Sequence, residues 1–219
     1  TDAKVTNTDA DGNSTTTGGA VSVGHDHVNV SGEHSRTTVD EDGNKSTTGV
    51  SGGVKLDGKK DTTTINAGVS HSEVNADGTK SSDAVTGTVT VDKDGHLATA
   101  GGTRTSSETT ATGTSSDKDT LKIDGAKHTI AFTGDHKETE KNEDGTSTAD
   151  TRKNTANVNW DDPSVKVSTA GEHKDIAADG SSVANRTGMT GGLSGNGMNI
   201  GASVGRTDTD AEGDALKHD

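Results

Sequence analysis

Four histidines have the residue type and the spacing that could bind a metal ion: His25, His27, His96 and His128. Each lies at or just after a turn flanked by valine, leucine or isoleucine. His25 and His27 form a His-x-His pair, which on a strand places both imidazoles on one face and allows zinc or copper chelation. A structural zinc site normally takes four ligands, and the chain has no cysteine. The sequence therefore favours solvated turn histidines and predicts no metal or other cofactor.

Three Asp-x-Asp-Gly segments, at 9–12, 40–43 and 92–95, resemble the beginning of a calcium-binding loop. An EF-hand loop also needs a bidentate Glu at its twelfth position. That position holds Ala20 in the first segment and Ser51 in the second. We therefore expect type I turns followed by a glycine bulge, in which the Asp side chain bonds its own backbone.

The sequence contains no evident group of residues typical of a catalytic site. Ser and Thr are so frequent that some lie near a histidine by chance, and the Gly-x-Ser-x-Gly pattern of a nucleophile elbow is absent. The glycine-rich segment 188–201 lacks the Lys-Ser/Thr ending of a phosphate-binding loop. The sequence predicts a protein that is not an enzyme.

The elements that would position any site are indicated by eight Asp-Gly dipeptides between alternating Thr, Ser and Val residues. They lie at 11–12, 42–43, 57–58, 77–78, 94–95, 124–125, 144–145 and 179–180. Asp-Gly between alternating segments is a strong hairpin signal, because Gly supplies the positive φ of a tight turn. The sequence therefore predicts a series of antiparallel hairpins.

The turns are of two alternating kinds. Those with apolar flanks have centres near 25, 58, 93, 125, 162 and 196. The others have polar flanks, and one of them is expected near Ser115–Lys118. The spacing predicts a repeat of about 34 residues, each a hairpin of two strands of roughly 12–15 residues. About twelve full strands and two shorter terminal ones follow from the number of turns.

Composition leaves little material for an apolar core. The chain has one Phe, one Trp and no Tyr, and its mean hydropathy is -0.82. We therefore expect an all-β, up-and-down sheet closed into one barrel of 12–14 strands, because closure pairs every edge without needing a large core. Glycines within the strands, such as Gly52 and Gly87, would permit the necessary curvature.

These features favour a non-enzymatic structural, spacer or carrier module, formed by a single repetitive domain (1–219) from a larger bacterial secreted or surface protein. The alternatives are a pore-forming or translocation barrel and a barrel that binds a small ligand or a metal. The net charge of -14 disfavours nucleic acid, and the scarcity of aromatic residues disfavours an outer-membrane barrel. We expect a monomer in an extracellular setting, whose partner is another part of the polypeptide or a protein bound at the Val-rich end.

Overall fold

The computed structural model describes residues 1–218, in which β-strands are the only regular elements. The fourteen strands are β1 (Asp2–Thr8), β2 (Ser14–Val23), β3 (His27–Val39), β4 (Lys45–Asp57), β5 (Thr62–Val74), β6 (Lys80–Asp92), β7 (Leu97–Thr109), β8 (Gly113–Asp124), β9 (Thr129–Lys141), β10 (Ser147–Asn159), β11 (Ser164–Ile176), β12 (Ser182–Ser194), β13 (Gly197–Thr209) and β14 (Ala215–His218). The terminal strands have 7 and 4 residues, whereas the others have 10 to 13. The predicted all-β series of hairpins, with short strands at both ends, is confirmed.

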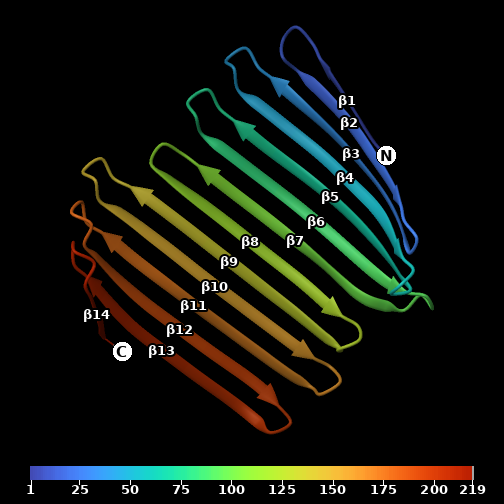
Figure 1. The fold of residues 1–219 in the computed structure, drawn as a ribbon. Helices are drawn as coiled ribbons and strands as arrows, with labels where there is room; N and C mark the ends of the chain where they lie inside the picture. Colours follow the sequence, from blue (N-terminus) through green and yellow to red (C-terminus); the bar gives the residue numbers. More distant parts are fainter. Residues whose placement is uncertain (219) are drawn as a thin grey trace. The chain divides into compact units, whose positions relative to one another are not determined.

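The strands follow one another in the sheet in chain order, and neighbouring strands run antiparallel (Figure 1). Strand β1 pairs with β2, β14 pairs with β13, and no pairing joins β1 to β14 in residues 1–218. The sheet is therefore open, and the predicted closed barrel is wrong. A barrel of this many strands surrounds a wide lumen. Val, Thr and Gly side chains are too small to fill such a lumen, so closure would add edge hydrogen bonds without a packed interior.

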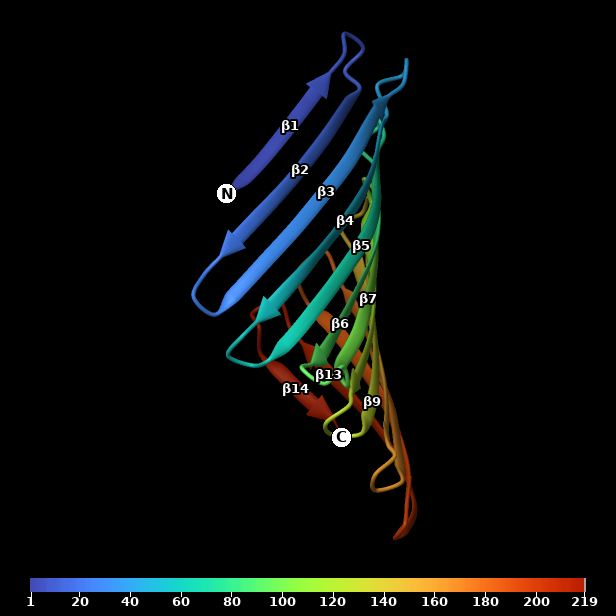
Figure 2. The same cartoon turned by 90° about the vertical axis from the view of Figure 1, so that its right-hand side faces the viewer.

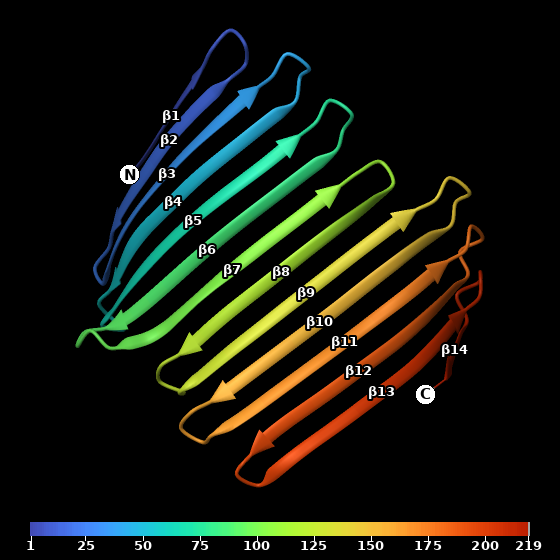
Figure 3. The same cartoon turned by 180° about the vertical axis from the view of Figure 1, so that it is seen from behind.

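The chain divides into two structural units. Unit 1 comprises Thr1–Ser106 and Leu121–Lys127, and unit 2 comprises Ser107–Thr120 and His128–Asp219. In unit 1, strands β1–β5 lie side by side, and successive turns alternate between their two ends (Figure 2). In unit 2, strands β9–β14 are arranged in the same manner, with the short β14 beside one end of β13 (Figure 3).

One face of unit 1 carries apolar side chains in a row that crosses the strands. Residues directly opposite each other in an antiparallel pair point to the same face. The strand register aligns Val21, Val30, Val54, Ile65 and Val89 across β2–β6. The adjacent row on the same face has almost no side chains, and it consists of Gly19, Gly32, Gly52, Ala67 and Gly87. The apolar residues therefore border a strip of exposed backbone.

Side-chain burial contributes little to this fold. Among the described hydrophobic residues, only Ala184 is buried, at 5% exposure, whereas Val54 and Ile65 remain 41% and 53% exposed. Each of the strands β2–β6 and β9–β13 nevertheless pairs with a neighbour over nearly its whole length. The inter-strand hydrogen bonds, and not a hydrophobic core, are therefore the main determinant of this structure.

Seven turns share one geometry, in which the N–H of the first residue donates to the carbonyl of the fifth, and the N–H of the fourth donates to the carbonyl of the first. They occupy 9–13, 40–44, 75–79, 92–96, 142–146, 177–181 and 210–214. The fourth residue is always a Gly with φ between 82° and 96°. This is the predicted type I turn with a glycine bulge.

The prediction of a turn near Ser115–Lys118 is wrong, because these residues lie within β8. The chain reverses instead at Thr110–Gly113, where the N–H of Thr110 donates to the carbonyl of Gly113 at 2.8 Å. The Thr110 hydroxyl also accepts the N–H of Gly113 at 3.1 Å. A Thr hydroxyl is a weaker turn signal than Asp-Gly, which explains why the pattern placed this turn too late.

Candidate functional site

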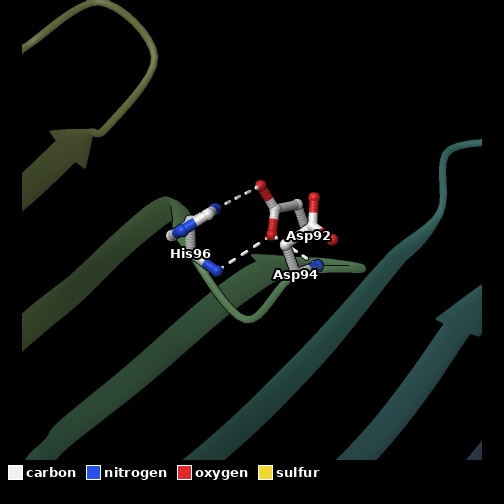
Figure 4. Close-up of side chains that lie close together, drawn as sticks. All are labelled: Asp92, Asp94 and His96. Atoms are coloured by element: carbon white, nitrogen blue, oxygen red, sulfur yellow. Dashed lines mark hydrogen bonds and ion pairs between the residues drawn. The ribbon is translucent and has the colours of Figure 1, made fainter.

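The one predicted histidine that joins a cluster of possible metal ligands is His96, in the turn between β6 and β7 of unit 1. Within the described residues, its ring nitrogen and a carboxylate oxygen from each of Asp92 and Asp94 lie within 4.8 Å of one another (Figure 4). A second group of this kind, Asp210, Glu212 and Asp214, contains only carboxylates. Both groups belong to five-residue turns with a glycine bulge.

The ligand atoms at the His96 turn are already engaged in holding the turn. One Asp92 oxygen accepts the N–H of Asp94 and the N–H of His96, both at 2.9 Å. The other Asp92 oxygen is 3.4 Å from the His96 ring, and both Asp94 oxygens are 3.0 Å from the Lys93 ammonium. An exposed three-residue group with a lysine on one ligand lacks the closed four-ligand shell of a structural zinc site.

The other three predicted histidines each have local partners. His25 is 98% exposed, and its ring lies 3.7 Å from Asp26. The His27 ring lies against the backbone of Gly24, in the space that a side chain there would fill. His128, in unit 2, contacts the Trp160 ring with a centroid separation of 5.7 Å and lies 3.6 Å from an Asp161 carboxylate. Neither described metal-ligand group includes any of the three.

The turn carboxylates act as acceptors for their own loops. Asp40 accepts the N–H of Asp42 and of Asn44, and the Asn44 amide donates to its second oxygen at 2.9 Å. This amide bond is the largest cause that lowers the pKa of Asp40, and the equivalent bond from Asn13 lowers the pKa of Asp9. In the same way, bonds from Thr146 lower the pKa of Asp144. The acidic residues of these turns therefore serve the architecture.

Acid should weaken the fold through these turns. A carboxylate whose folded pKa is lowered contributes stability above its unfolded pKa of 3.8, and this stability is lost as the pH falls through the folded pKa. We expect the urea midpoint to fall between pH 5 and pH 2, and to fall less in the double variant Asp9→Asn, Asp40→Asn. The neighbouring double variant Asp11→Asn, Asp42→Asn is the matched control. An equal pH dependence in both variants would contradict this role.

A second set of histidines lies inside the strands and contacts side chains of neighbouring strands. His34, His71, His136 and His173 lie on β3, β5, β9 and β11. In each, Nδ1 contacts a side-chain oxygen on the preceding strand, namely that of Thr17, Thr48, Asp117 and Asp150 respectively. Sequence reasoning missed this set, although three of its members begin a His-x-Glu or His-x-Asp triplet that recurs along the chain.

His173 in unit 2 shows the chemistry of this arrangement. Its Nδ1 is 2.7 Å from Asp150, and its Nε2 is 3.2 Å from Asp175. Two carboxylates can both accept from one imidazole only when both ring nitrogens carry a proton. The hydrogen bond with Asp150, followed by the charge of that residue, raises the pKa of His173 above 6.5. Both nitrogens are therefore engaged, and the Nδ1 contact with Asp150 joins β11 to β10.

The titration of His173 tests this arrangement. We expect its NMR titration midpoint to lie above 6.5, and Asp150→Asn to bring it down toward that value. Since the folded pKa is raised, the contribution to stability is complete below pH 6.5 and is lost as the pH rises through the folded pKa. The matched control, Asp117→Asn, removes the carboxylate beside His136 and should leave the His173 titration unchanged. A midpoint that is insensitive to Asp150→Asn would contradict the pairing.

An apolar depression in unit 1 includes part of the strip of small residues, at Ala67 and Gly87. It has a volume of about 650 Å³ and is open to solvent on one side. Its apolar lining includes Ile65, Val69, Val85, Val89, Leu121 and Ile123, and its floor includes Gly87, Gly101 and Gly102. The glycines leave room between the apolar side chains that line the depression.

Comparison with known proteins gives no family for this chain: it matches no protein-family model and no curated protein. Within residues 1–218, no helix has the length and apolar character needed to cross a membrane. The functional argument therefore depends on the geometry of the turns, the strand histidines and the sheet faces.

Proposed function

We propose that this chain is a non-enzymatic structural module, a repetitive β-sheet that serves as a spacer or carrier in a larger bacterial secreted or surface protein. The observation that carries the proposal is that the carboxylates and histidines of the chain hold its turns and strands. The turn carboxylates accept backbone N–H groups, and both ring nitrogens of His173 are engaged, Nδ1 with Asp150 on β10 and Nε2 with Asp175 on its own strand. Groups that a catalytic site would leave free for a substrate are engaged here in holding the sheet.

The regularity of the strands supports the same proposal. Most interior strands have 13 residues, and seven turns repeat one hydrogen-bonding pattern. A repetitive structure in which each hairpin contacts mainly its neighbours can be lengthened without a change in its architecture. The half-exposed apolar row of unit 1, which contains Val54 and Ile65, gives such a module a surface for a protein partner or for another part of the polypeptide.

Two measurements on the purified chain, dye release from liposomes and the melting temperature with added ligands, distinguish this proposal from a pore and from a binding module. We expect no release of dye from liposomes, and a melting temperature that changes by less than about 1 °C with Zn²⁺, Ca²⁺ or a fatty acid. Dye release would overturn the proposal in favour of a pore. A rise of several degrees with a fatty acid would indicate that the apolar depression of unit 1 is a ligand site.

The melting experiment with Zn²⁺ has its own control variants. A rise in melting temperature with Zn²⁺ that is abolished by Asp92→Asn together with His96→Gln would assign binding to the cluster at the β6–β7 turn. The control variant carries Asp11→Asn and His25→Gln, which lie outside the cluster. If its melting temperature rises with Zn²⁺ as much as that of the wild-type chain, Asp11 and His25 are not needed for binding. That pair of results would replace the structural proposal with a metal-binding function.

A further inference from the structure

Strands β2–β6 of unit 1 have two chemically different faces, and each of these strands has a neighbour on both sides (Figure 1). One face, which we call the apolar face, carries four adjacent rows of side chains that pass through Val50, Gly52, Val54 and Leu56 of β4. At the same level, the opposite face of β2–β6 carries Ser, Thr, Asn, Gly, Ala, Lys and Glu but no Val, Leu or Ile. An amphipathic sheet of this kind normally packs its apolar face against a second layer.

A groove crosses the apolar face between two ridges. The Val54 and Leu56 rows form the ridge on one side, and the Val50 row forms the ridge on the other. Val50 is 50% exposed and Leu56 is 45% exposed. The groove, which we call the glycine groove, is the row formed by Gly19, Gly32, Gly52, Ala67 and Gly87. The apolar depression belongs to this groove, because its lining includes Ala67 and Gly87 together with Ile65, Val69, Val85 and Val89.

The apolar face is complementary to a second copy of itself. Consider a two-fold axis that lies between two facing copies, parallel to the rows and at the level of Gly53. It keeps the order of the strands and reverses their direction. It places Val54 of one copy over Gly52 of the other, and Leu56 over Val50. The same relation holds on the neighbouring strands, where it places Val30 over Gly32, Ile65 over Ala67 and Val89 over Gly87. A ridge of each copy therefore enters the glycine groove of the other.

The register of this packing is specific. An axis at the level of Gly52 would stack Val54 on Val50 and leave the two glycine grooves facing each other across a void, which loses contacts. An axis at the level of Ser51 would bring Val54 over the row of Thr48, which contains charged residues. Only the axis at Gly53 brings all four apolar rows into contact with apolar rows and fills both grooves.

The same axis matches charges at the rim of the apolar face. The row beyond Val50 contains Arg36 on β3 and Asp83 on β6. In the second copy, the residues at that level are Asp26 and Lys93, which lie in turns two residues beyond Val28 and Val91. Arg36 therefore approaches Asp26, and Asp83 approaches Lys93. Opposite charges around an apolar centre favour this register over its alternatives.

We propose that this chain forms a symmetric dimer in which the apolar faces of two copies pack together, with the Val54 row of each copy in the glycine groove of the other. Sheets that pack face to face lie about 10 Å apart, with strands aligned to within about 30°. A two-fold contact of this kind closes on itself and gives a dimer and no larger assembly. The dimer departs from the monomer expected from the sequence.

The size of the apolar face is sufficient for a dimer. Four rows about 6.8 Å apart on five strands about 4.8 Å apart cover roughly 650 Å² of each copy. The dimer therefore buries about 1,300 Å² in total, at the lower end of the range for specific complexes, and we expect a dissociation constant on the order of 10 µM. The proposal names a partner for the apolar surface of unit 1. It does not depend on the spacer role, because an enzyme or a binding module could dimerise in the same way.

Sedimentation of the full chain from about 1 to 500 µM tests the proposal, in 0.15 M NaCl to screen the repulsion between copies of net charge -14. The disruptive variant carries Gly32→Val and Gly87→Val, which fill the groove. An added Cβ comes no closer than 3.8 Å to another residue at Gly32 and 4.0 Å at Gly87. Because Val also favours strands, the urea midpoint should stay equal or rise. We expect an at least tenfold weaker dimer.

This variant separates specific packing from general hydrophobic association. The two added valines make the apolar face more apolar, so non-specific association would become stronger, whereas a dimer that needs the glycine groove becomes weaker. The matched control is Thr88→Val, which adds a valine to the opposite face of β6 beside Gly87. We expect it to leave the dimer unchanged. Equal weakening in Thr88→Val would overturn the assignment of the interface to the apolar face.

A charge exchange tests the register by a second route. Lys93→Glu brings two negative charges together at the rim, opposite Asp83 of the other copy, and should weaken the dimer several-fold. Adding Asp83→Lys to this variant restores opposite charges and should return the dissociation constant to within about twofold of the wild-type value. A double variant that dimerises no better than Lys93→Glu would overturn the register.

Three further results would overturn the dimer. The first is a wild-type chain that stays monomeric throughout the concentration range. The second is a stronger dimer in the Gly32→Val, Gly87→Val variant, and the third is an assembly larger than a dimer. If the monomeric chain instead floated with phosphatidylcholine vesicles, the apolar face would be a lipid-binding surface. None of these results changes the dye-release and melting measurements, so failure of the dimer and failure of the spacer role are distinguishable.

Discussion

Proline at Ser51 should lower the free energy of unfolding by about 3 kcal/mol, because it fixes φ and removes a backbone donor in the middle of a sheet. Ser51 lies in β4, opposite Glu33 of β3 and Gly68 of β5. Strands on both sides must adjust to the change. In a fold with so few buried side chains, the packing of a core cannot compensate for a broken ladder. Urea unfolding followed by circular dichroism measures the loss.

The control for this substitution is Lys4→Pro on the terminal strand β1. The N–H of Asp9 donates to Asn13, and the N–H of Val21 donates to Thr1. Odd-numbered residues of β1 therefore face β2, and the Lys4 N–H points away from the sheet. Lys4→Pro also loses the exposed ion pair with Glu33, and its total cost should stay below about 1 kcal/mol. Equal losses in the two variants would show that the ladder is not the main source of stability.

Alanine at Gly125 should be the second large effect, with a loss of about 2–3 kcal/mol. Gly125 follows β8 in unit 1, and its N–H donates to the carbonyl of Ala98 at 2.9 Å. A Cβ at this position would lie far inside van der Waals contact of the Leu97 carbonyl oxygen. Because that oxygen belongs to the backbone, the strand itself must move. Thermal or urea unfolding measures the effect.

The matched control is Gly195→Ala, at the turn between β12 and β13. This glycine also follows a long strand at an apolar-flanked turn, but no atom lies within 4 Å of an added Cβ. The change should cost nothing, or stabilise the chain slightly by restricting its unfolded state. If Gly195→Ala destabilised the chain as much as Gly125→Ala, the close backbone approach at Gly125 would not explain the effect.

The local elements of this fold were predictable from sequence because their causes are local. The turn at 40–44 contains within five residues the Asp that accepts the backbone N–H groups and the Gly that adopts positive φ. Apolar residues such as Val54 alternate with polar ones, and this two-residue period indicated a strand. At Thr110–Gly113, where a Thr hydroxyl replaces the Asp-Gly signal, the same reasoning placed the turn several residues too late.

The candidate site was less predictable, because the partners of a strand histidine lie on another strand. His173 and Asp150 are separated by 23 residues and meet only through the register of β10 and β11. A one-residue change of register would turn the two side chains to opposite faces. The turn histidines His25 and His128 attracted attention by their spacing, yet their contacts are with the adjacent Asp26 and with Trp160 and Asp161.

The sequence by itself determined the strands, the turns apart from the one at Thr110–Gly113, and the chain-order pairing, since each depends on residues that are close along the chain. Only the tertiary structure decided that β1 and β14 do not pair, which faces carry the valines, and which histidines meet carboxylates. These features depend on register and curvature summed over many strands. Small side chains such as those of Gly52 and Val54 constrain register and curvature only weakly, because they neither fill a lumen nor pack against a second layer.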